Sequence, residues 1–428
     1  MRIMLINPPN AGRSIPEEEY GITAVKEIFR GEPLALEAIA GNLEGHEVTI
    51  VDLKVEPDAL WQAYDHFKPD LIGFTGATCE ANSIIHLSEE IRKSYHPVIV
   101  VGGHHATCDP AFFNRSCIDF IVAGLGKKSF RELVDSLEQK KNAAGIPGVA
   151  ITQPGGQLSF IQRTFTPVDL VDDKAPRYDL VKKYRSAYVL TKLGMNLGFV
   201  VTAFGCTHRC AFCSIPSTTG GKYLTHQIDS VIRDIRLLED IPVIRMVDAN
   251  TFGDVTIAAA LCDRIIQEGI RKRLLADIRP DTVVRYPGLI RKWKTAGLSH
   301  VIVGFEDIDD GTLQSYRKGI EVETSRKAID ILHEAGIAIV GDFIVSPDYG
   351  HEDFTRLERF IRENKIEIPI LSILTPVPGT PLYKKMKNQI EIHDLDYYTF
   401  LNAVTPTRLD KKDFYKTFAD LFMSFHKN

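Results

Sequence analysis

The chain has 428 residues, of which 44% are hydrophobic and 25% charged, a profile typical of a globular protein of two or three domains. Lys and Arg number 51 and Asp and Glu 56, so the formal charge of -5 leaves no basic excess to neutralise the phosphates of a nucleic acid. No stretch approaches the ~18 apolar residues that a membrane span needs, and the apolar run in residues 1–9 is too short for a signal peptide. We therefore expect a cytoplasmic protein with no nucleic acid partner and no membrane span.

Residues 1–140 alternate short apolar runs with amphipathic stretches, which predicts an α/β domain with a doubly wound parallel sheet, Rossmann-like in type. The expected strands are 3–7, 48–52, 70–75, 98–101 and 119–122, and the expected helices are 33–42, 58–67 and 81–94. Ligands of such sheets bind beyond the carboxyl ends of the strands. The candidate binding residues follow the strands, and they are Thr75, Thr78, Gly102, Gly103, His104, His105, Gly124 and Gly126.

Residues 141–193 interrupt this rhythm with prolines and a Pro154-Gly155-Gly156 turn, which predicts a hairpin and then a linker that runs over the surface. Three tyrosines of the linker either line a cavity or pack the domains together. We expect packing, because aromatic rings bury large areas at domain interfaces. They are Tyr178, Tyr184 and Tyr188.

The alternation resumes over residues 194–385, where six strand and helix units predict a partial (β/α)6 barrel. The expected strands are 200–203, 243–248, 273–277, 300–304, 338–345 and 369–374, and the expected helices are 227–238, 255–268, 287–296, 323–335 and 352–364. The chemistry of such barrels lies at the carboxyl ends of the strands. Residues 386–428 are rich in Phe and Tyr, and we expect them to form a short helical element that serves as a lid or as packing.

Three of the seven cysteines form a cluster with the spacing C-x3-C-x2-C, directly after the first barrel strand. They are Cys206, Cys210 and Cys213. Three thiolates can hold three corners of an iron-sulfur cube and leave the fourth iron open. The alternative is a zinc site, which needs a fourth protein ligand such as His208.

The cysteine loop, with the aromatic Phe212 before its last cysteine, resembles the signature of the radical S-adenosylmethionine (SAM) superfamily. The resemblance implies a [4Fe-4S] cluster whose open iron binds the amino and carboxylate groups of SAM, and whose electron cleaves SAM to a 5′-deoxyadenosyl radical. It continues through the ends of the later strands. The SAM-binding residues that it implies are Phe212, Asp248, Asn250, Arg279, Glu306, Asp342 and Pro376. Alternatively, Arg279 and Glu306 are ordinary salt-bridge partners of a barrel.

The first domain, placed before such a barrel, resembles the cobalamin-binding domain of B12-dependent radical SAM enzymes through its glycine turns in order. That resemblance implies cobalamin as a further cofactor. The chain lacks the Asp-x-His-x-x-Gly loop that supplies an axial histidine to cobalt, which leaves His104 and His105 as the histidines to watch, although turn histidines are more often hydrogen-bonded structure. It also has Gly124-Leu125-Gly126-Lys127 where the family usually has Gly-Glu-Gly-Glu.

The resemblance implies a C-methyltransferase. The radical would abstract hydrogen from an unactivated carbon, and methylcobalamin would donate the methyl group. The expected substrate is a small molecule or a peptide segment such as one of methyl-coenzyme M reductase, and an external electron donor such as ferredoxin or flavodoxin is expected. The alternatives are non-methylating chemistry with the same cofactors (ring formation, ring contraction or oxidation), a radical barrel without cobalamin, and a binding or sensor protein with a structural metal.

Overall fold

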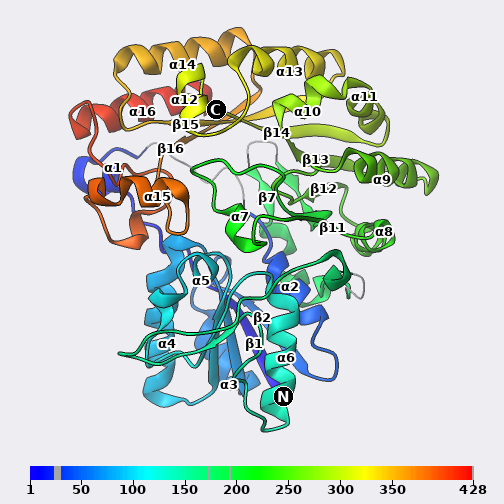
Figure 1. The fold of residues 1–428 in the computed structure, drawn as a ribbon. Coiled ribbons are helices and arrows are strands. Elements are labelled where there is room, and N and C mark those ends of the chain that lie inside the picture. The colour runs from blue at the N-terminus through cyan, green and yellow to red at the C-terminus, as the bar shows by residue number, and fades with distance from the viewer. Residues whose placement is uncertain (24–29, 171–173, 192–193, 427–428) are drawn as a thin grey trace.

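In the computed structural model, which describes residues 1–23, 30–170, 174–191 and 194–426, the chain forms two stacked α/β bodies (Figure 1). The first body is built from the N-terminal third of the chain. The second body holds most of the chain after the linker and carries the C-terminal helix. None of the helices in the described part of the chain is long and apolar enough to cross a membrane.

The first body is centred on a six-stranded sheet in the order β2-β1-β3-β4-β5-β6. Its strands are β1 (Arg2–Asn7), β2 (Glu47–Asp52), β3 (Leu71–Thr75), β4 (Val98–Gly102), β5 (Phe120–Val122) and β6 (Val149–Ile151). Strands β1 to β5 are parallel, and β6 runs antiparallel to β5 at the edge. Because the strand order reverses at β1, the predicted doubly wound sheet is confirmed.

Helices cover both faces of this sheet, as the alternation of buried side chains in β1 requires. Ile3 and Leu5 belong to the apolar core under α2 and α6, whereas Met4 and Ile6 belong to the core under α3 and α4. These helices are α2 (Leu34–Gly41), α3 (Ala59–Phe67), α4 (Ala81–Ser94) and α6 (Gly126–Glu138). The short helix α5 (His104–Cys108) follows β4 and lies at the carboxyl edge of the sheet, toward the second body.

The linker is only partly a surface segment. Residues 152–168 are largely exposed, but the 3₁₀ segment η4 (Tyr178–Ala187) is tucked between the bodies, which corrects the expectation of a surface linker. The hydroxyl of Tyr178 donates to the carbonyl of Phe199 (2.8 Å), and that of Tyr188 donates to the carboxylate of Asp52 (2.9 Å). The tyrosines thus pack the bodies together, as expected. Residues 171–173 and 192–193 of the predicted linker lie outside the described residues.

Two antiparallel strand pairs occur in the region for which the sequence predicts one hairpin. Strand β6 joins the sheet of the first body, and β7 (Val189–Leu190) pairs antiparallel with β8 (Met195–Asn196) just before the barrel. Both pairings are short, which is why proline and glycine positions alone did not locate them.

The second body is a six-stranded parallel sheet in the order β16-β15-β14-β13-β12-β9, the sequential order of a partial barrel. Its strands are β9 (Gly198–Val200), β12 (Val243–Met246), β13 (Arg273–Ile278), β14 (Leu298–Glu306), β15 (Ala338–Val345) and β16 (Ile368–Ile373). Its larger helices are α8 (Ile228–Leu237), α9 (Val255–Gln267), α11 (Pro287–Thr295), α13 (Val322–Glu334) and α14 (His351–Glu363). All six predicted strand and helix units are present, so the predicted (β/α)6 barrel is confirmed.

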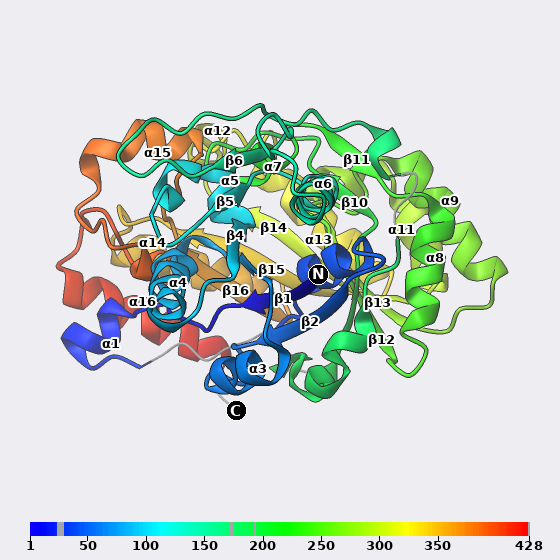
Figure 2. The same ribbon diagram turned by 90° about the horizontal axis from the view of Figure 1, so that it is seen from below.

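The C-terminal element packs on the barrel. Helix α16 (Lys411–His426) buries Phe414, Phe418 and Phe422 and contacts α14, β16 and the N-terminal helix α1 (Ile15–Tyr20). Figures 1 and 2 both show α1 beside α16, far from the rest of the first body. The aromatic residues of this tail therefore serve as packing.

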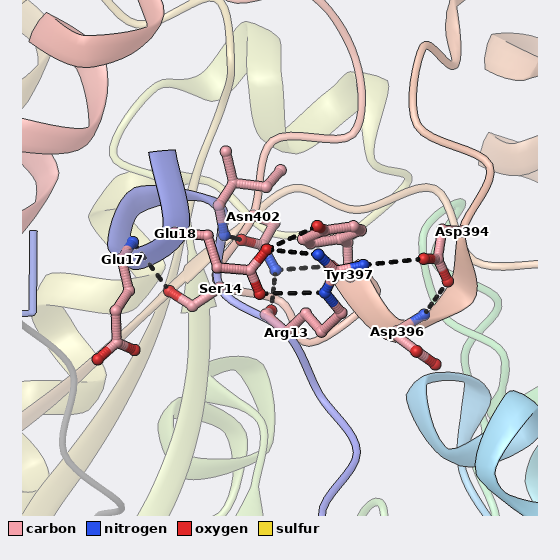
Figure 3. Close-up of polar contacts among 9 residues, drawn as sticks. Arg13, Ser14, Glu17, Glu18, Asp394, Asp396, Tyr397 and Asn402 are labelled. Atoms are coloured by element: carbon pink, nitrogen blue, oxygen red, sulfur yellow. Dashed lines mark hydrogen bonds and ion pairs between the residues drawn. The ribbon is translucent and has the colours of Figure 1, made fainter. Parts of the chain in front are cut away.

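Residues 13–18 and 394–402 meet in a polar contact, here called the clasp, which Figure 3 shows. Its centre is Asn402, which is fully buried. The Asn402 side-chain oxygen accepts a hydrogen bond from the Ile15 N–H (2.8 Å), and its nitrogen donates to the Arg13 carbonyl (2.9 Å). The segment that follows β1 is thus joined to the C-terminal element.

Candidate functional site

The cysteine loop follows a short hairpin at which the chain turns sharply. Strand β10 (Ala203–Gly205) pairs antiparallel with β11 (Tyr223–Thr225), and Gly205 ends β10 with a φ of +80°. A Cβ atom on Gly205 would overlap the Lys222 carbonyl, so only glycine fits where the loop begins. The sequence did not predict this hairpin, which fixes the position of Cys206.

The other end of the loop is held by backbone hydrogen bonds to two segments that follow barrel strands. The Ala211 N–H donates to the Tyr316 carbonyl (2.8 Å), and the Leu382 N–H donates to the Ala211 carbonyl (2.9 Å). The Phe212 ring lies edge-on to the Tyr316 ring, with centroids 5.5 Å apart. Phe212 therefore anchors the loop. Its contact with SAM stays a prediction.

The three thiols lie near enough for charge on one to affect another. Burial raises the pKa of Cys213 to about 12 and also raises the pKa of Cys210, and charge on the neighbouring Cys206 adds to both shifts. A bound cation would favour the thiolate forms of Cys210 and Cys213. Among the residues that the structure describes, no three His, Cys, Asp or Glu side chains converge on one ion, as zinc would require. Three thiolates from one short loop fit a cube, in which each thiolate binds a different iron.

A buried amide beside the loop has an oxygen with no protein partner. Asn250, which follows β12, is 1% exposed, and its side-chain nitrogen donates to Thr207 Oγ1 in the cysteine loop (3.4 Å). Its Oδ1 has no hydrogen-bond partner in the protein. A buried acceptor of this kind needs a donor, and the amino group of SAM, expected at the end of this strand, would supply one. The residues present therefore fit SAM here.

Asp248 holds the turn before the hairpin. One carboxylate oxygen accepts the N–H groups of Thr202 (2.7 Å) and Ala203 (2.9 Å), and the other accepts the Thr202 hydroxyl (2.6 Å). These three bonds account for its burial at 4% exposure. The structure thus gives Asp248 a positioning role, and its direct contact with SAM stays a prediction.

Arg279 and Glu306 are joined through a residue that the sequence reasoning missed. Lys318 donates from Nζ to Glu306 Oε1 (2.6 Å), and Arg279 donates to the Lys318 carbonyl (2.7 Å). Arg279 also pairs with Asp281 (2.9 Å). A Cβ on Gly304 would overlap Glu306 Oε1, so this glycine leaves room for the pair. The structure therefore brings together the predicted Arg279 and Glu306 as a buried charged network at the ends of β13 and β14.

Lys318 gave no signal in the sequence because it lies in a loop without a recognisable spacing. Its predecessor Arg317 has a φ of +54° and Glu306 a φ of +68°, a backbone region that favours glycine. Two such residues around one ion pair indicate that the surrounding contacts hold them in place.

Asp342 lies on β15 near the same network. Burial raises the pKa of Asp342 well above its ordinary value, and the negative charges of Glu306 and Asp277 add to the shift. Pro376, which follows β16, is buried beside Thr375. Their expected contacts with SAM stay predictions.

A cavity of about 450 Å³ lies between the carboxyl edge of the first sheet and the barrel. Apolar side chains of both bodies line it, among them Leu34 and Phe74 from the first body and Val201, Phe204 and Ile215 from the second. The predicted cobalamin-binding residues that line it are Thr75, Gly102, Gly103, His104, Gly124 and Gly126. Lys127, which replaces an acidic residue of the usual motif, also lines the cavity.

The two glycine turns allow close backbone approach at this cavity. Gly103 has a φ of +92°, and a Cβ there would overlap Thr75 Oγ1. Gly124 has a φ of +83°, and its Cβ would lie 2.8 Å from the Phe165 ring. Glycine is needed at both positions, for conformation and for space. A broad cavity with backbone turns and apolar walls fits a corrinoid ring.

Thr78 and His105 do not line the cavity, so the structure does not bring them together with the other six, and their contact with cobalamin stays a prediction. His105 is fully buried in the first body, where its ring lies edge-on to Phe112 and Phe113, and its Nδ1 lies 3.3 Å from Thr78 Oγ1. Burial lowers the pKa of His105 to about 4. Successive side chains of a helix point in different directions, so His104 faces the cavity while His105 faces the core.

The two bodies match known families. Residues 24–134 match the B12 binding domain, and residues 200–361 match the radical SAM superfamily. Hopanoid C-3 methylase of Methylococcus capsulatus is 28% identical over 399 residues, which cover 91% of this chain and 75% of the methylase. Anaerobic magnesium-protoporphyrin IX monomethyl ester cyclase of Synechocystis is 24% identical over 362 residues, which cover 80% of this chain and 68% of the cyclase.

A solved structure shares the whole arrangement. The radical S-adenosylmethionine methyltransferase TsrM from Kitasatospora setae, with cobalamin and a [4Fe-4S] cluster bound, has a TM-score of 0.73 at 20% identity, with 91% of this chain and 75% of TsrM covered. At this identity the likeness shows the fold.

The chain is thus a two-domain protein in which a B12 binding domain precedes a radical SAM domain. It is similar to cobalamin-dependent radical SAM enzymes, methyltransferases among them, as the motifs predicted. Its cofactors are accordingly a [4Fe-4S] cluster, SAM and cobalamin. The alternatives of a barrel without cobalamin and of a sensor with a structural metal receive no support.

Proposed function

We propose that this protein methylates an unactivated carbon atom of its substrate. The observation that carries the proposal is the shared wall of the cavity. Gly103 and Gly124 come from the B12 binding domain, whereas Ile215 and Thr218 come from the helix that directly follows Cys213. The glycine turns predicted to bind cobalamin and the residues on either side of the cysteine loop therefore border one space, which supports a reaction that uses both cofactors.

When bound, the cluster and SAM supply hydrogen abstraction from the substrate, and cobalamin supplies the methyl group. The chain's own residues bind and orient. Asn250 offers a buried oxygen to an amino group, and Arg279 and Lys318 bring positive charge to the ends of β13 and β14. The apolar cavity walls exclude water, which would otherwise compete for reactive groups. An external one-electron donor, such as ferredoxin or flavodoxin, completes the requirements.

The second candidate is non-methylating radical chemistry with the same cofactors. It is favoured by the similarity to the anaerobic cyclase. Methyl transfer is favoured by the higher identity to the hopanoid methylase. A peptide substrate such as methyl-coenzyme M reductase rests on the sequence resemblance alone and stays a prediction.

The test is anaerobic reconstitution with iron, sulfide and cobalamin, followed by reduction in the presence of SAM with a deuterated methyl group. We expect bound iron and sulfide, a corrinoid absorption band, and 5′-deoxyadenosine. With a candidate substrate we expect a product that carries the deuterated methyl group. Deoxyadenosine together with an altered but unlabelled product would overturn methyl transfer in favour of the second candidate. Absence of both cofactors would overturn both.

A further inference from the structure

Helix α5 touches both cofactor sites. It begins at His104, directly after the Gly103 turn, and His104 lines the cavity between the bodies. Its Nε2 lies 2.6 Å from the Oγ of Ser214, in a hydrogen bond whose donor depends on which ring nitrogen carries the proton. Ser214 is the residue after the cluster cysteine Cys213. One side-chain contact therefore connects the cobalamin turn with the cluster loop.

Hydrogen bonds also fix α5 to the two glycine turns of the cavity. The Gly124 N–H donates to Thr107 Oγ1 (2.9 Å), and the Thr107 hydroxyl donates to the Gly103 carbonyl (2.8 Å). Thr107 thus ties the two glycine turns of the cavity to one another and to α5. A displacement of either turn moves the helix that carries His104.

On the barrel side, α5 packs against the turn that follows β16. A Cβ on Gly379 would lie 2.8 Å from the Cβ of Cys108, so helix and turn are in close contact. Ser217, three residues after Ser214, donates to the Gly379 carbonyl (3.3 Å). The cluster loop, this turn and α5 therefore form one packed unit, in which interfaces shift together rather than separately.

The His104 ring can form its hydrogen bond in the uncharged state. Burial lowers the pKa of His104, so the ring is uncharged near neutral pH. A neutral imidazole can donate or accept at Nε2 without the cost of a buried charge. The contact with Ser214 occupies the Nε2 atom of the ring.

We propose that the His104–Ser214 hydrogen bond is a positioning contact that couples the two cofactor sites, so that assembly of the cluster tightens cobalamin binding and the reverse. The proposal rests on the cofactor assignment above and on no property of the substrate. Coupling between two binding sites is reciprocal, so it is measurable from either side.

The test compares cobalamin affinity of the cluster-loaded and iron-free forms of the full chain, measured anaerobically with hydroxocobalamin. For the wild type we expect about threefold to tenfold tighter binding in the loaded form, the size of one hydrogen bond. His104→Ala and Ser214→Ala should each remove this difference, and the double variant should add nothing to either. Ser217→Ala, in the helix that Ser214 caps, removes a hydrogen bond to the Gly379 carbonyl and none to α5, and should keep it. His104→Gln, whose amide can also bond Ser214, should restore part of it.

Electron paramagnetic resonance of the cob(II)alamin form is the second readout. We expect no nitrogen coupling from His104, so the wild-type and His104→Ala spectra should agree in that respect. A nitrogen coupling that is lost in His104→Ala would make His104 a cobalt ligand and overturn the proposal. So would an undiminished affinity difference in His104→Ala and Ser214→Ala, or its absence from a wild type that binds both cofactors. A wild type that binds neither cofactor would instead overturn the proposed function.

Discussion

At the residue scale, the barrel holds buried charge that is already paired. Lys318 neutralises Glu306, and both side chains are about nine-tenths buried or more. Charges at such depth persist only when partners satisfy them. The ends of β13 and β14 therefore offer a polar interior that a zwitterionic ligand can enter without facing an isolated charge.

A second buried carboxylate gives a pH-dependent stability. Burial raises the pKa of Asp307 to about 6, although the Tyr349 hydroxyl donates to it (2.9 Å). In the unfolded chain the pKa is about 3.9. A raised folded pKa means that the native state holds the proton more tightly, so this contribution to stability is full below pH ~4 and is lost as pH rises to about 6.

We therefore expect the unfolding free energy of the wild type to fall relative to that of Asp307→Asn as pH rises between about 4 and 6, by about 3 kcal/mol. Above pH ~6 the difference should be constant. Urea unfolding of both proteins across this range measures it. A difference that does not vary with pH would contradict the assigned pKa.

Cys206→Ala should abolish cluster assembly and the formation of 5′-deoxyadenosine, because only two thiolates would remain for the cube. Iron and sulfide content after anaerobic reconstitution, and chromatography of the nucleoside, measure these effects. Cys79→Ala is the matched control, since Cys79 lies in the first body outside the loop. Full iron content in Cys206→Ala would refute the assignment of the cluster ligands.

At the scale of elements, the glycine turns shape the cobalamin cavity. A comparison of two glycines distinguishes the effect of backbone strain from the effect of steric crowding. Gly103 and Gly145 have similar φ values, +92° and +88°, but a Cβ on Gly145 meets nothing within 4 Å. Both Gly→Ala changes should cost about 1 kcal/mol of stability from backbone strain.

Only Gly103→Ala should weaken cobalamin binding, by about tenfold or more, because its Cβ displaces the turn from Thr75. Iron content should be unchanged in both variants. Cobalamin titration monitored by absorption distinguishes them. Equal affinities in the two variants would show that the Gly103 turn does not contact the cofactor.

Long elements with clear periodicity were predictable, whereas short pairings were not. All six barrel strands follow from apolar runs separated by amphipathic stretches, and α4 begins and ends at the predicted residues. The β10–β11 hairpin has three residues in each strand, too few for a periodic signal. The buried part of the linker was missed because its tyrosines hydrogen-bond to distant residues, which no local pattern encodes.

The site divides in the same way. The three cysteines were predictable because they lie in one short segment with a characteristic spacing. Lys318 and Ser214 act through partners that are distant in sequence, Glu306 and His104, and only the fold brings them together. Thr78 and His105 lie apart from the cavity because adjacent residues after a strand can face opposite sides of the helix that follows, which the sequence does not reveal.

At the scale of the whole molecule, the clasp joins the two bodies at a point remote from the cavity. Asn82 at the start of α4 also donates to Asp394 (2.9 Å) and Asp396 (3.1 Å), so the C-terminal element contacts the first body twice. The bodies are therefore held at the linker on one side and at the clasp on the other.

Asn402→Ala should lower the unfolding free energy by about 3 kcal/mol, because the buried Ile15 N–H and Arg13 carbonyl lose their partner. It should also speed proteolysis of the N-terminal segment. Asn364→Ala, which removes a single bond to the Phe360 carbonyl at a helix end, is the control. Urea unfolding and limited proteolysis measure both effects. Equal losses in the two variants would mean that the clasp contributes no more than an ordinary helix end.

The clasp also imposes an order on biosynthesis. Ile15 and Asn402 are 387 positions apart, so the early partner leaves the ribosome long before the late one is translated. Nascent chains generally fold their N-terminal domains first. The first sheet can therefore be complete while the Ile15 N–H still lacks its partner, and this hydrogen bond forms only after Asn402 has been translated. A polypeptide that ends before residue 402 would leave the Ile15 N–H and the Arg13 carbonyl without this partner.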